Sequence, residues 1–197
     1  MLKVGITGGI GSGKTTICQI FESLDIPVYY ADERAKWLMS NDLKLVSGIK
    51  THFGVEAYFP DGSLNRNHIS NMVFKNSSKL STLNALVHPA VAADAEIWFD
   101  KQKNAPYALK EAALLVESKS YLSLDRLIVV AAPLELRIQR VMNRDGVDKQ
   151  KVEERIGHQM PEEDKLKYAD FIINNDGIHL LLPQVINIHR ILLSFNA

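Results

Sequence analysis

A glycine-rich segment near the start of the chain constrains its fold more than any other feature. Residues 8–15 read GGIGSGKT and match the phosphate-binding pattern G-x-x-x-x-G-K-[ST] at every fixed position. In such a loop the glycines let backbone N–H groups approach phosphate oxygens, the lysine adds a positive charge, and the last hydroxyl binds Mg²⁺. A strand–helix turn without a ligand is the alternative, but the complete motif favours phosphate binding. The residues expected to contact a nucleotide are Gly9, Ile10, Gly11, Ser12, Gly13, Lys14, Thr15 and Thr16.

The segments around this loop predict alternating strands and helices. Residues 14–24 repeat apolar side chains at helical spacing, between two short apolar runs. Strand, glycine loop, helix and strand in this order are typical of an α/β fold with a parallel sheet flanked by helices. The five expected strands lie at 2–7, 26–31, 107–115, 126–132 and 171–174.

Two segments interrupt this alternation. The middle of the chain is mostly helical in pattern and rich in Ser, Asn and His, and Pro89 fits the first turn of a helix that ends near residue 103. A charged segment before the last strand is broken by Gly146, Gly157 and Pro161, as expected for a closing lid. The predicted organisation is a core of residues 1–31, 104–140 and 168–197, a helical substrate-binding insertion of residues 32–103, and a helical lid of residues 141–167.

Composition excludes several classes of protein. The formal net charge is zero, so the basic excess of most nucleic-acid binders is missing. No apolar run approaches the roughly 18 residues of a membrane helix, and the few residues before the glycine loop leave no room for a signal peptide. The single cysteine, Cys18, allows no intrachain disulfide and is expected to be a small buried packing residue. These features predict a cytoplasmic protein without nucleic-acid or membrane partners.

The phosphate loop predicts nucleotide binding but does not specify the reaction. The chain lacks an Asn-Lys-x-Asp sequence, the guanine-binding signature of GTP-dependent switches. A helical insertion and an arginine-bearing lid favour a small-molecule kinase, which needs an acceptor site and a lid that excludes water. A kinase for a nucleoside monophosphate, a non-kinase nucleotide switch and an inactive homologue remain the alternatives. The intact Lys14 and Thr15 argue against the last.

Several segments, in order along nearly the whole chain, resemble the dephospho-coenzyme A kinase family. One segment departs from it, because residues 113–117 read ALLVE where the family commonly has Pro-Leu-Leu-Phe-Glu. The resemblance implies that ATP and Mg²⁺ are used to phosphorylate the ribose 3′-hydroxyl of dephospho-coenzyme A, the last step of coenzyme A synthesis. The segments that carry it are residues 5–15, Ala31 and Asp32, residues 61–66 with Val73 and Phe74, residues 86–89, residues 139–145, Arg155 with Gln159 and Met160, and residues 169–175.

Asp32 is the candidate for activating the acceptor hydroxyl. It follows an expected strand, and ligands of open parallel sheets bind at the carboxyl ends of strands. We therefore expect Asp32 to orient the acceptor hydroxyl and to accept its proton. An N-cap role at the next helix is the alternative, and the two roles are compatible.

Three arginines share one face of the helix expected after residue 133. Arg137, Arg140 and Arg144 stand at i, i+3 and i+7. Such arginines could hold the transferring phosphoryl group and ADP, whereas a solvated charged face is the alternative. With the phosphate loop and the resemblance, we expect Arg140 to be catalytic and both Arg140 and Arg144 to bind ATP.

The remaining candidates concern the metal and the substrates. Glu111 ends the third expected strand and is the candidate Mg²⁺ partner besides Thr15, with an exposed strand end as the alternative. Arg66, His88 and Glu117 are candidate substrate contacts. A surface salt bridge for Arg66 and a position at the start of a helix for His88 are equally compatible with the sequence. The resemblance adds Asn175 as an ATP contact. The sequence leaves the oligomeric state open.

Overall fold

The computed structural model describes residues 1–74 and 76–195. By its internal contacts the chain divides into two compact units, one formed by Met1–Tyr30 and Phe99–Ala197 and the other by Ala31–Trp98. Within the described residues, no helix combines the length and the apolar character needed to cross a membrane.

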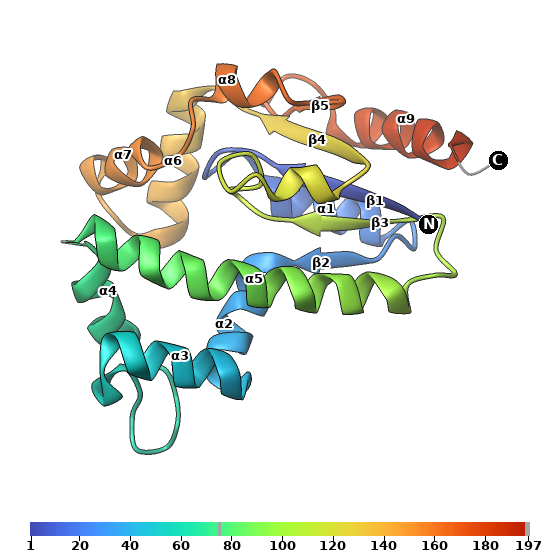
Figure 1. Ribbon diagram of the computed structural model, residues 1–197. Helices are drawn as coiled ribbons and strands as arrows, with labels where there is room; N and C mark the ends of the chain where they lie inside the picture. The colour runs from blue at the N-terminus through green and yellow to red at the C-terminus, as the bar shows by residue number, and fades with distance from the viewer. Residues whose placement is uncertain (75, 196–197) are drawn as a thin grey trace. The chain divides into compact units, whose positions relative to one another are not determined.

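The first unit is built on a parallel sheet (Figure 1) with the strand order β2-β3-β1-β4-β5. All four neighbouring pairs of strands run parallel. The prediction of a five-stranded parallel sheet in an α/β fold is therefore confirmed, although β2, β3 and β4 are shorter than expected. The strands are β1 (Leu2–Thr7), β2 (Val28–Tyr30), β3 (Tyr107–Glu111), β4 (Arg126–Ala131) and β5 (Phe171–Asn174).

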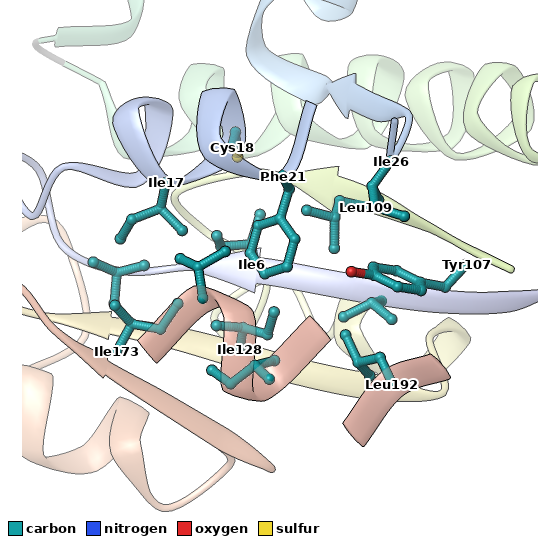
Figure 2. Packing of buried hydrophobic residues seen from close by; sticks show 14 residues of the cluster. Ile6, Ile17, Cys18, Phe21, Ile26, Tyr107, Leu109, Ile128, Ile173 and Leu192 are labelled. Carbon is teal, nitrogen blue, oxygen red and sulfur yellow. The ribbon is translucent and has the colours of Figure 1, made fainter. Parts of the chain in front are cut away.

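Helices and loops cover the two faces of this sheet. Because side chains alternate along a strand, Ile128 and Val130 of β4 face one layer while Leu127 and Val129 face the other. Further side chains of the first layer come from α1 and α9, and Figure 2 shows Phe21 of α1 among them. The loop after β3 and the segment around α8 pack on the opposite face. The helices of this unit are α1 (Lys14–Glu22), η2 (Ser120–Ser123), α6 (Leu134–Asp145), α7 (Lys149–Gly157), α8 (Glu162–Leu166) and α9 (Leu181–Ser194).

Cys18 belongs to the layer that Figure 2 shows, as a fully buried packing residue. Burial, followed by the nearby carboxylates of Glu111 and Glu22, raises the pKa of its thiol far above the usual range. The thiol is thus uncharged, in agreement with the packing role expected from the sequence.

The second unit is helical, as the middle of the sequence predicts. The carboxylate of Asp42 starts α3 by accepting hydrogen bonds from the amides of Lys44 and Leu45 at 2.9 and 3.0 Å. Its own small core includes Leu38 of α2 and Ile49 of α3. The helices are α2 (Ala31–Asn41), α3 (Leu43–Phe53), η1 (Val55–Ala57), α4 (Arg66–Phe74) and α5 (Ser77–Lys101), the last of which continues into the first unit.

One expectation and one alternative interpretation about this part of the chain are wrong. Pro89 does not lie in a first helical turn but inside α5, which begins twelve residues earlier at Ser77. Proline removes one helical N–H donor, and the neighbouring side chains of Val87, Ala90 and Val91 stabilise α5 here by packing in the core of this unit. The other correction concerns Asp32, which is not an N-cap because α2 already begins at Ala31. Its carboxylate lies in the first turn, where the helix dipole favours a negative charge.

Candidate active site

The phosphate loop connects β1 to α1 through a backbone that only glycine adopts readily. Gly11 and Gly13 have φ angles of 79° and 90°, in the left-handed region. Gly13 is also the N-cap of α1 and offers no side chain to the amides of the first turn. Those amides, with the positive end of the helix dipole, form a site for an anion. The hydroxyl-bearing side chains of Thr15 and Thr16 are exposed at this end of the helix.

Lys14 is held against the loop and close to a carboxylate. Its Nζ donates hydrogen bonds to the carbonyl oxygens of Gly8 at 2.9 Å and Gly9 at 3.5 Å. The same atom lies 4.0 Å from Glu111 Oε1, and both side chains are about nine-tenths buried. The sheet explains this proximity, because Glu111 at the end of β3 pairs with Ile6 of β1 immediately before the loop. The structure therefore brings together the catalytic and metal-binding candidates from two distant segments.

Asn175 and Arg140 hold the other side of the loop. Asn175 follows β5 and donates from Nδ2 to the Ser12 carbonyl at 2.7 Å, while its Oδ1 accepts from Arg140 Nη2 at 3.1 Å. Arg140 Nη1 donates to the carbonyl oxygens of Asn175 at 3.1 Å and Gly11 at 3.5 Å. A side chain at Gly13 would collide with the Asn175 amide. Two residues expected to bind ATP are thus positioned directly at the loop.

The other two arginines of α6 have different surroundings. Arg144 is exposed, and its Nε donates to Asp145 at 2.7 Å. This hydrogen bond is the first cause that holds the pKa of Asp145 below its usual range. Arg137 is buried, and its guanidinium occupies the space that a side chain at Gly9 would need. Arg144 lies a helical turn beyond Arg140, so a shared helix face did not bring all three arginines to the loop.

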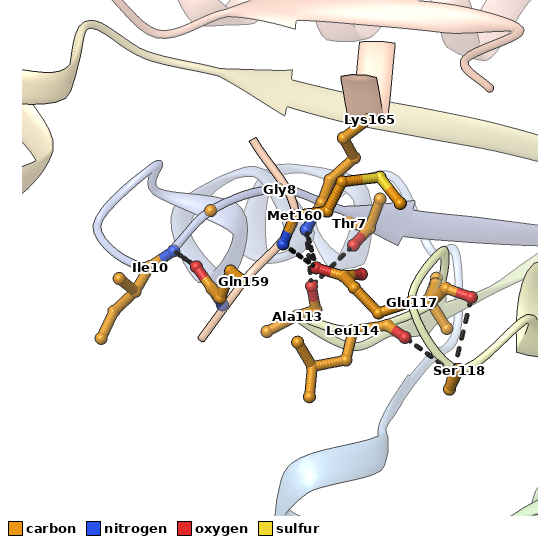
Figure 3. Close-up of polar contacts among 12 residues, drawn as sticks. Thr7, Gly8, Ile10, Ala113, Leu114, Glu117, Ser118, Gln159, Met160 and Lys165 are labelled. Atoms are coloured by element: carbon orange, nitrogen blue, oxygen red, sulfur yellow. Dashed lines mark hydrogen bonds and ion pairs between the residues drawn. The ribbon is translucent and has the colours of Figure 1, made fainter. Parts of the chain in front are cut away.

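The segment between α7 and α8 is tied to the same loop (Figure 3). Gln159 Oε1 accepts a hydrogen bond from the Ile10 amide at 2.8 Å. The next residue, Met160, donates its amide to Glu117 Oε1 at 3.0 Å. Glu117 lies on the loop after β3, so this contact fastens one end of the predicted lid to the segment that departs from the family pattern.

Figure 3 also shows a buried lysine in this contact. Lys165 of α8 donates from Nζ to Glu117 Oε1 at 2.9 Å and to the Ala113 carbonyl at 3.0 Å, with its side chain 1% exposed. The same carbonyl accepts from Thr7 Oγ1 at 3.2 Å, which links the lysine to the end of β1. Sequence reasoning missed Lys165 because the charged segment around it gives no sign that one lysine is buried. Gln159 lies in a segment that resembles the family, but the sequence predicts no individual role for it.

The acceptor-side candidates belong to the second unit. Asp32, Arg66 and His88 are all exposed and lie on α2, α4 and α5. His88 lies in the interior of α5, so its expected place at the start of a helix is wrong. The substrate roles of these three residues and of Glu117 stay predictions.

The oxygen atoms near the loop fit a metal ion that takes its other ligands from a bound nucleotide and from water. In the described part of the chain, no group of three or more His, Cys, Asp or Glu side chains could hold a metal by itself. Mg²⁺ usually keeps several water ligands and binds through one or two carboxylates and substrate phosphates. The Thr15 hydroxyl and the Glu111 carboxylate are such a partial donor set.

Comparison with known proteins shows the family of this chain. Residues 2–180 match a family model described as Dephospho-CoA kinase. Curated relatives with that name include proteins from Bacteroides fragilis, 34% identical over 95% of this chain and 91% of the relative, and from Salinibacter ruber, 37% identical over 90% of each.

Solved structures give the same result. A protein from Thermus thermophilus is 32% identical with a TM-score of 0.83, and the alignment covers 98% of this chain and 97% of that one. A dephospho-CoA kinase from Campylobacter jejuni is 25% identical with a TM-score of 0.73, covering 99% and 98%. A shikimate kinase from Acinetobacter baumannii, 14% identical with a TM-score of 0.51 over 99% and 94%, shares the fold. From its sequence and its structure, this chain belongs to the dephospho-CoA kinase family.

Proposed function

We propose that this protein transfers the γ-phosphoryl group of ATP to the ribose 3′-hydroxyl of dephospho-coenzyme A, giving coenzyme A and ADP. The family match carries this proposal, because it extends over residues 2–180 and so includes both the phosphate loop and the segment after β5. Phosphoryl transfer needs positioning and charge stabilisation more than covalent chemistry from the protein. The site around the loop supplies cationic groups for that purpose.

The nucleotide side of the reaction uses the loop and the residues that support it. The backbone amides of residues 9–16 bind the phosphate oxygens, and Lys14 exchanges its carbonyl partners for the β- and γ-phosphates. Arg140 stabilises the charge on the transferring phosphoryl group. Asn175 contacts ATP and holds the Arg140 guanidinium in position. Arg144, at the exposed end of α6, closes onto the nucleotide.

Thr15 and Glu111 would hold Mg²⁺ together with the nucleotide. When bound, the ion neutralises charge on the β- and γ-phosphate oxygens. The short distance between Glu111 and Lys14 supports this role, since a carboxylate beside the phosphate lysine lies where a nucleotide-borne cation would approach.

The acceptor side uses residues of the helical unit. Asp32 orients the acceptor hydroxyl and accepts its proton, which requires a carboxylate within hydrogen-bond reach of that oxygen. Arg66 and His88 contact dephospho-coenzyme A, and Glu117 contributes from the loop after β3. The charged segment of residues 141–167 acts as the lid, and its hydrogen bonds to Ile10 and Glu117 support a lid that covers the phosphate loop.

A coupled assay of ADP release tests the reaction. The protein is incubated with Mg-ATP and, in separate reactions, dephospho-coenzyme A, AMP, CMP, shikimate or no acceptor. We expect turnover with dephospho-coenzyme A alone, and its loss by at least about a hundredfold in Lys14→Ala. Preference for a nucleoside monophosphate or shikimate would assign another acceptor, and nucleotide binding without any acceptor phosphorylation would indicate a switch.

A further inference from the structure

Arg137 carries a buried positive charge with few partners. Its side chain is 8% exposed, and the only polar partner that the described residues give its guanidinium is the Glu162 carboxylate. The distance from Nε to Glu162 Oε2 is 3.8 Å, which is an ion-pair contact but is too long for a hydrogen bond. Nε is one of the few buried side-chain atoms without a hydrogen-bond partner among the described residues.

An arrangement of this kind calls for an acceptor from outside the protein. A guanidinium has five N–H donors, and a buried donor that stays unpaired loses the solvation it has in water. Glu162 cannot serve fully, because its Oε2 also accepts from the Ala132 amide at 3.2 Å. The structure therefore keeps an arginine in place without using its donors.

Arg137 also lines a cavity beside the phosphate loop. The cavity has a volume of about 600 Å³, and its wall includes Leu134, Gln159 and Met160 as well as Glu162. Two of the residues in this wall reach the loop itself. The Arg137 guanidinium lies against Gly9, and Gln159 accepts from the Ile10 amide at 2.8 Å. A ligand group that enters the cavity thus comes close to the start of the phosphate loop.

We propose that Arg137 binds a phosphate group of a substrate in this cavity, as a binding residue in addition to Lys14 and Arg140. Arginine suits this task because its planar fork pairs with two phosphate oxygens at once. Glu162 holds the guanidinium in place through the ion pair. The phosphate comes from the terminal part of ATP or from the acceptor, so the inference rests on the proposed function.

Equilibrium binding distinguishes these sources without relying on turnover. Isothermal titration calorimetry is performed with a non-hydrolysable ATP analogue, with ADP and with dephospho-coenzyme A, on the wild type and on Arg137→Met. We expect at least one of the affinities to fall about tenfold or more, because a charge-assisted hydrogen bond is lost. Loss with the ATP analogue alone assigns the γ-phosphate, loss with both nucleotides assigns the β-phosphate, and loss with dephospho-coenzyme A assigns the acceptor.

Two further variants separate ligand binding from folding. Gln139→Ala changes an exposed residue of the same helix and should bind all three ligands like the wild type. Arg137→Lys keeps the charge and loses the fork, so it should show a weaker form of the same loss even if Arg137→Met does not fold. Unchanged affinities in a folded Arg137→Met or in Arg137→Lys would overturn the proposal and leave a structural ion pair with Glu162. Absence of wild-type turnover with dephospho-coenzyme A would instead refute the proposed function, while the nucleotide titrations would still report on Arg137.

Discussion

The side-chain amide of Asn175 bridges the phosphate loop and Arg140, donating to the Ser12 carbonyl at 2.7 Å and accepting from the Arg140 guanidinium at 3.1 Å. The residue comes directly after β5, whose pairing with β4 places it beside the loop: Ala131 of β4 is the register partner of Asn174. One amide thus sets the position of both a backbone segment and a cationic side chain.

This bridge predicts coupled effects of Asn175 and Arg140 on turnover. Asn175→Ala should lower kcat/KM by about tenfold, since it removes hydrogen bonds to the loop and to a charged group. Adding Arg140→Ala to Asn175→Ala should cost less than Arg140→Ala costs alone, because the two residues act through one network. A double-mutant cycle of kcat/KM measures the coupling, with Asn143→Ala on the exposed part of α6 as a control. Strict additivity would contradict the bridge.

Gly9 is a glycine for reasons of space. A Cβ at this position would fall inside the contact distance of Arg137 Nη1. Gly9→Ala should therefore displace the guanidinium at the far end of the arginine side chain and lower kcat/KM, with a stability loss at the lower end of the about 1–3 kcal/mol that overpacking costs. Arg137→Ala removes the side chain that would collide with an alanine at position 9, so the double variant should lose less stability than the sum of the two single losses. Thermal unfolding of the wild type, the two single variants and the double variant measures this coupling, and strictly additive losses would refute the steric account.

Breaking the Lys165–Glu117 ion pair by removing one partner should lower the stability of the protein. Both charges are largely buried, so Lys165→Met leaves Glu117 uncompensated, at a cost of about 3–5 kcal/mol in the free energy of unfolding. Removing both charges in Lys165→Met with Glu117→Met should restore part of that loss. Lys167→Met is a matched control on the exposed side of the same segment and should unfold like the wild type. Urea unfolding of the wild type, Lys165→Met, the double variant and Lys167→Met measures these differences. If Lys165→Met were as stable as Lys167→Met, a structural role for the pair would be excluded.

Asp32→Asn tests the proposed proton acceptor. The substitution keeps the size of the side chain and its place in the first turn of α2, but removes the basic oxygen. We expect kcat to fall at least about a hundredfold while the affinity for ATP stays near that of the wild type. Steady-state turnover assays give kcat, and calorimetry gives the affinity for ATP. Glu33→Gln, the adjacent exposed carboxylate, is the control, and equal effects of the two substitutions would argue against a specific role for Asp32.

Protonation of His189 should lower the free energy of unfolding on mild acidification. Desolvation lowers the pKa of this histidine, and its Nδ1 shares a hydrogen bond of 2.6 Å with the buried Tyr107 hydroxyl. The unfolded chain therefore takes up a proton at higher pH than the folded chain. The contribution of His189 is present above about pH 6.5 and is lost as the pH falls through the lowered pKa.

Urea midpoints between pH 7.5 and 5 measure this contribution. The wild type should lose more stability than His189→Gln, which keeps a hydrogen-bonding group but does not titrate. Parallel curves for the two proteins would show that His189 has the same pKa in both states.

Local sequence patterns predict the phosphate loop and the strands well. The placement of Pro89 and the surroundings of the candidate site depend instead on contacts between residues distant in the sequence. The phosphate loop and the five strands follow from motifs and apolar runs that are complete within a few residues. Pro89 was placed wrongly because the packing of Val87 and its neighbours overrides the local helix-breaking tendency.

The surroundings of the candidate site depend on contacts between distant parts of the sequence. The hydrogen bond between Gln159 and Ile10 spans 149 positions, and the one between Lys165 and Ala113 spans 52. Nothing in the local sequence distinguishes Lys165 from the solvated lysines around it. Likewise, a shared helix face could not reveal that Arg137 is buried while Arg144 is exposed.

The burial of Cys18 has a practical consequence for observing the lid. It is the only cysteine in the chain, its side chain is fully buried, and its thiol stays protonated. Maleimide reagents attack the exposed thiolate, so the native protein should be almost inert to them. A cysteine introduced at an exposed lid position such as Glu154 would then take up a fluorescent dye selectively, without prior removal of the natural thiol. Movement of the lid could be followed by fluorescence in a protein that is otherwise wild type.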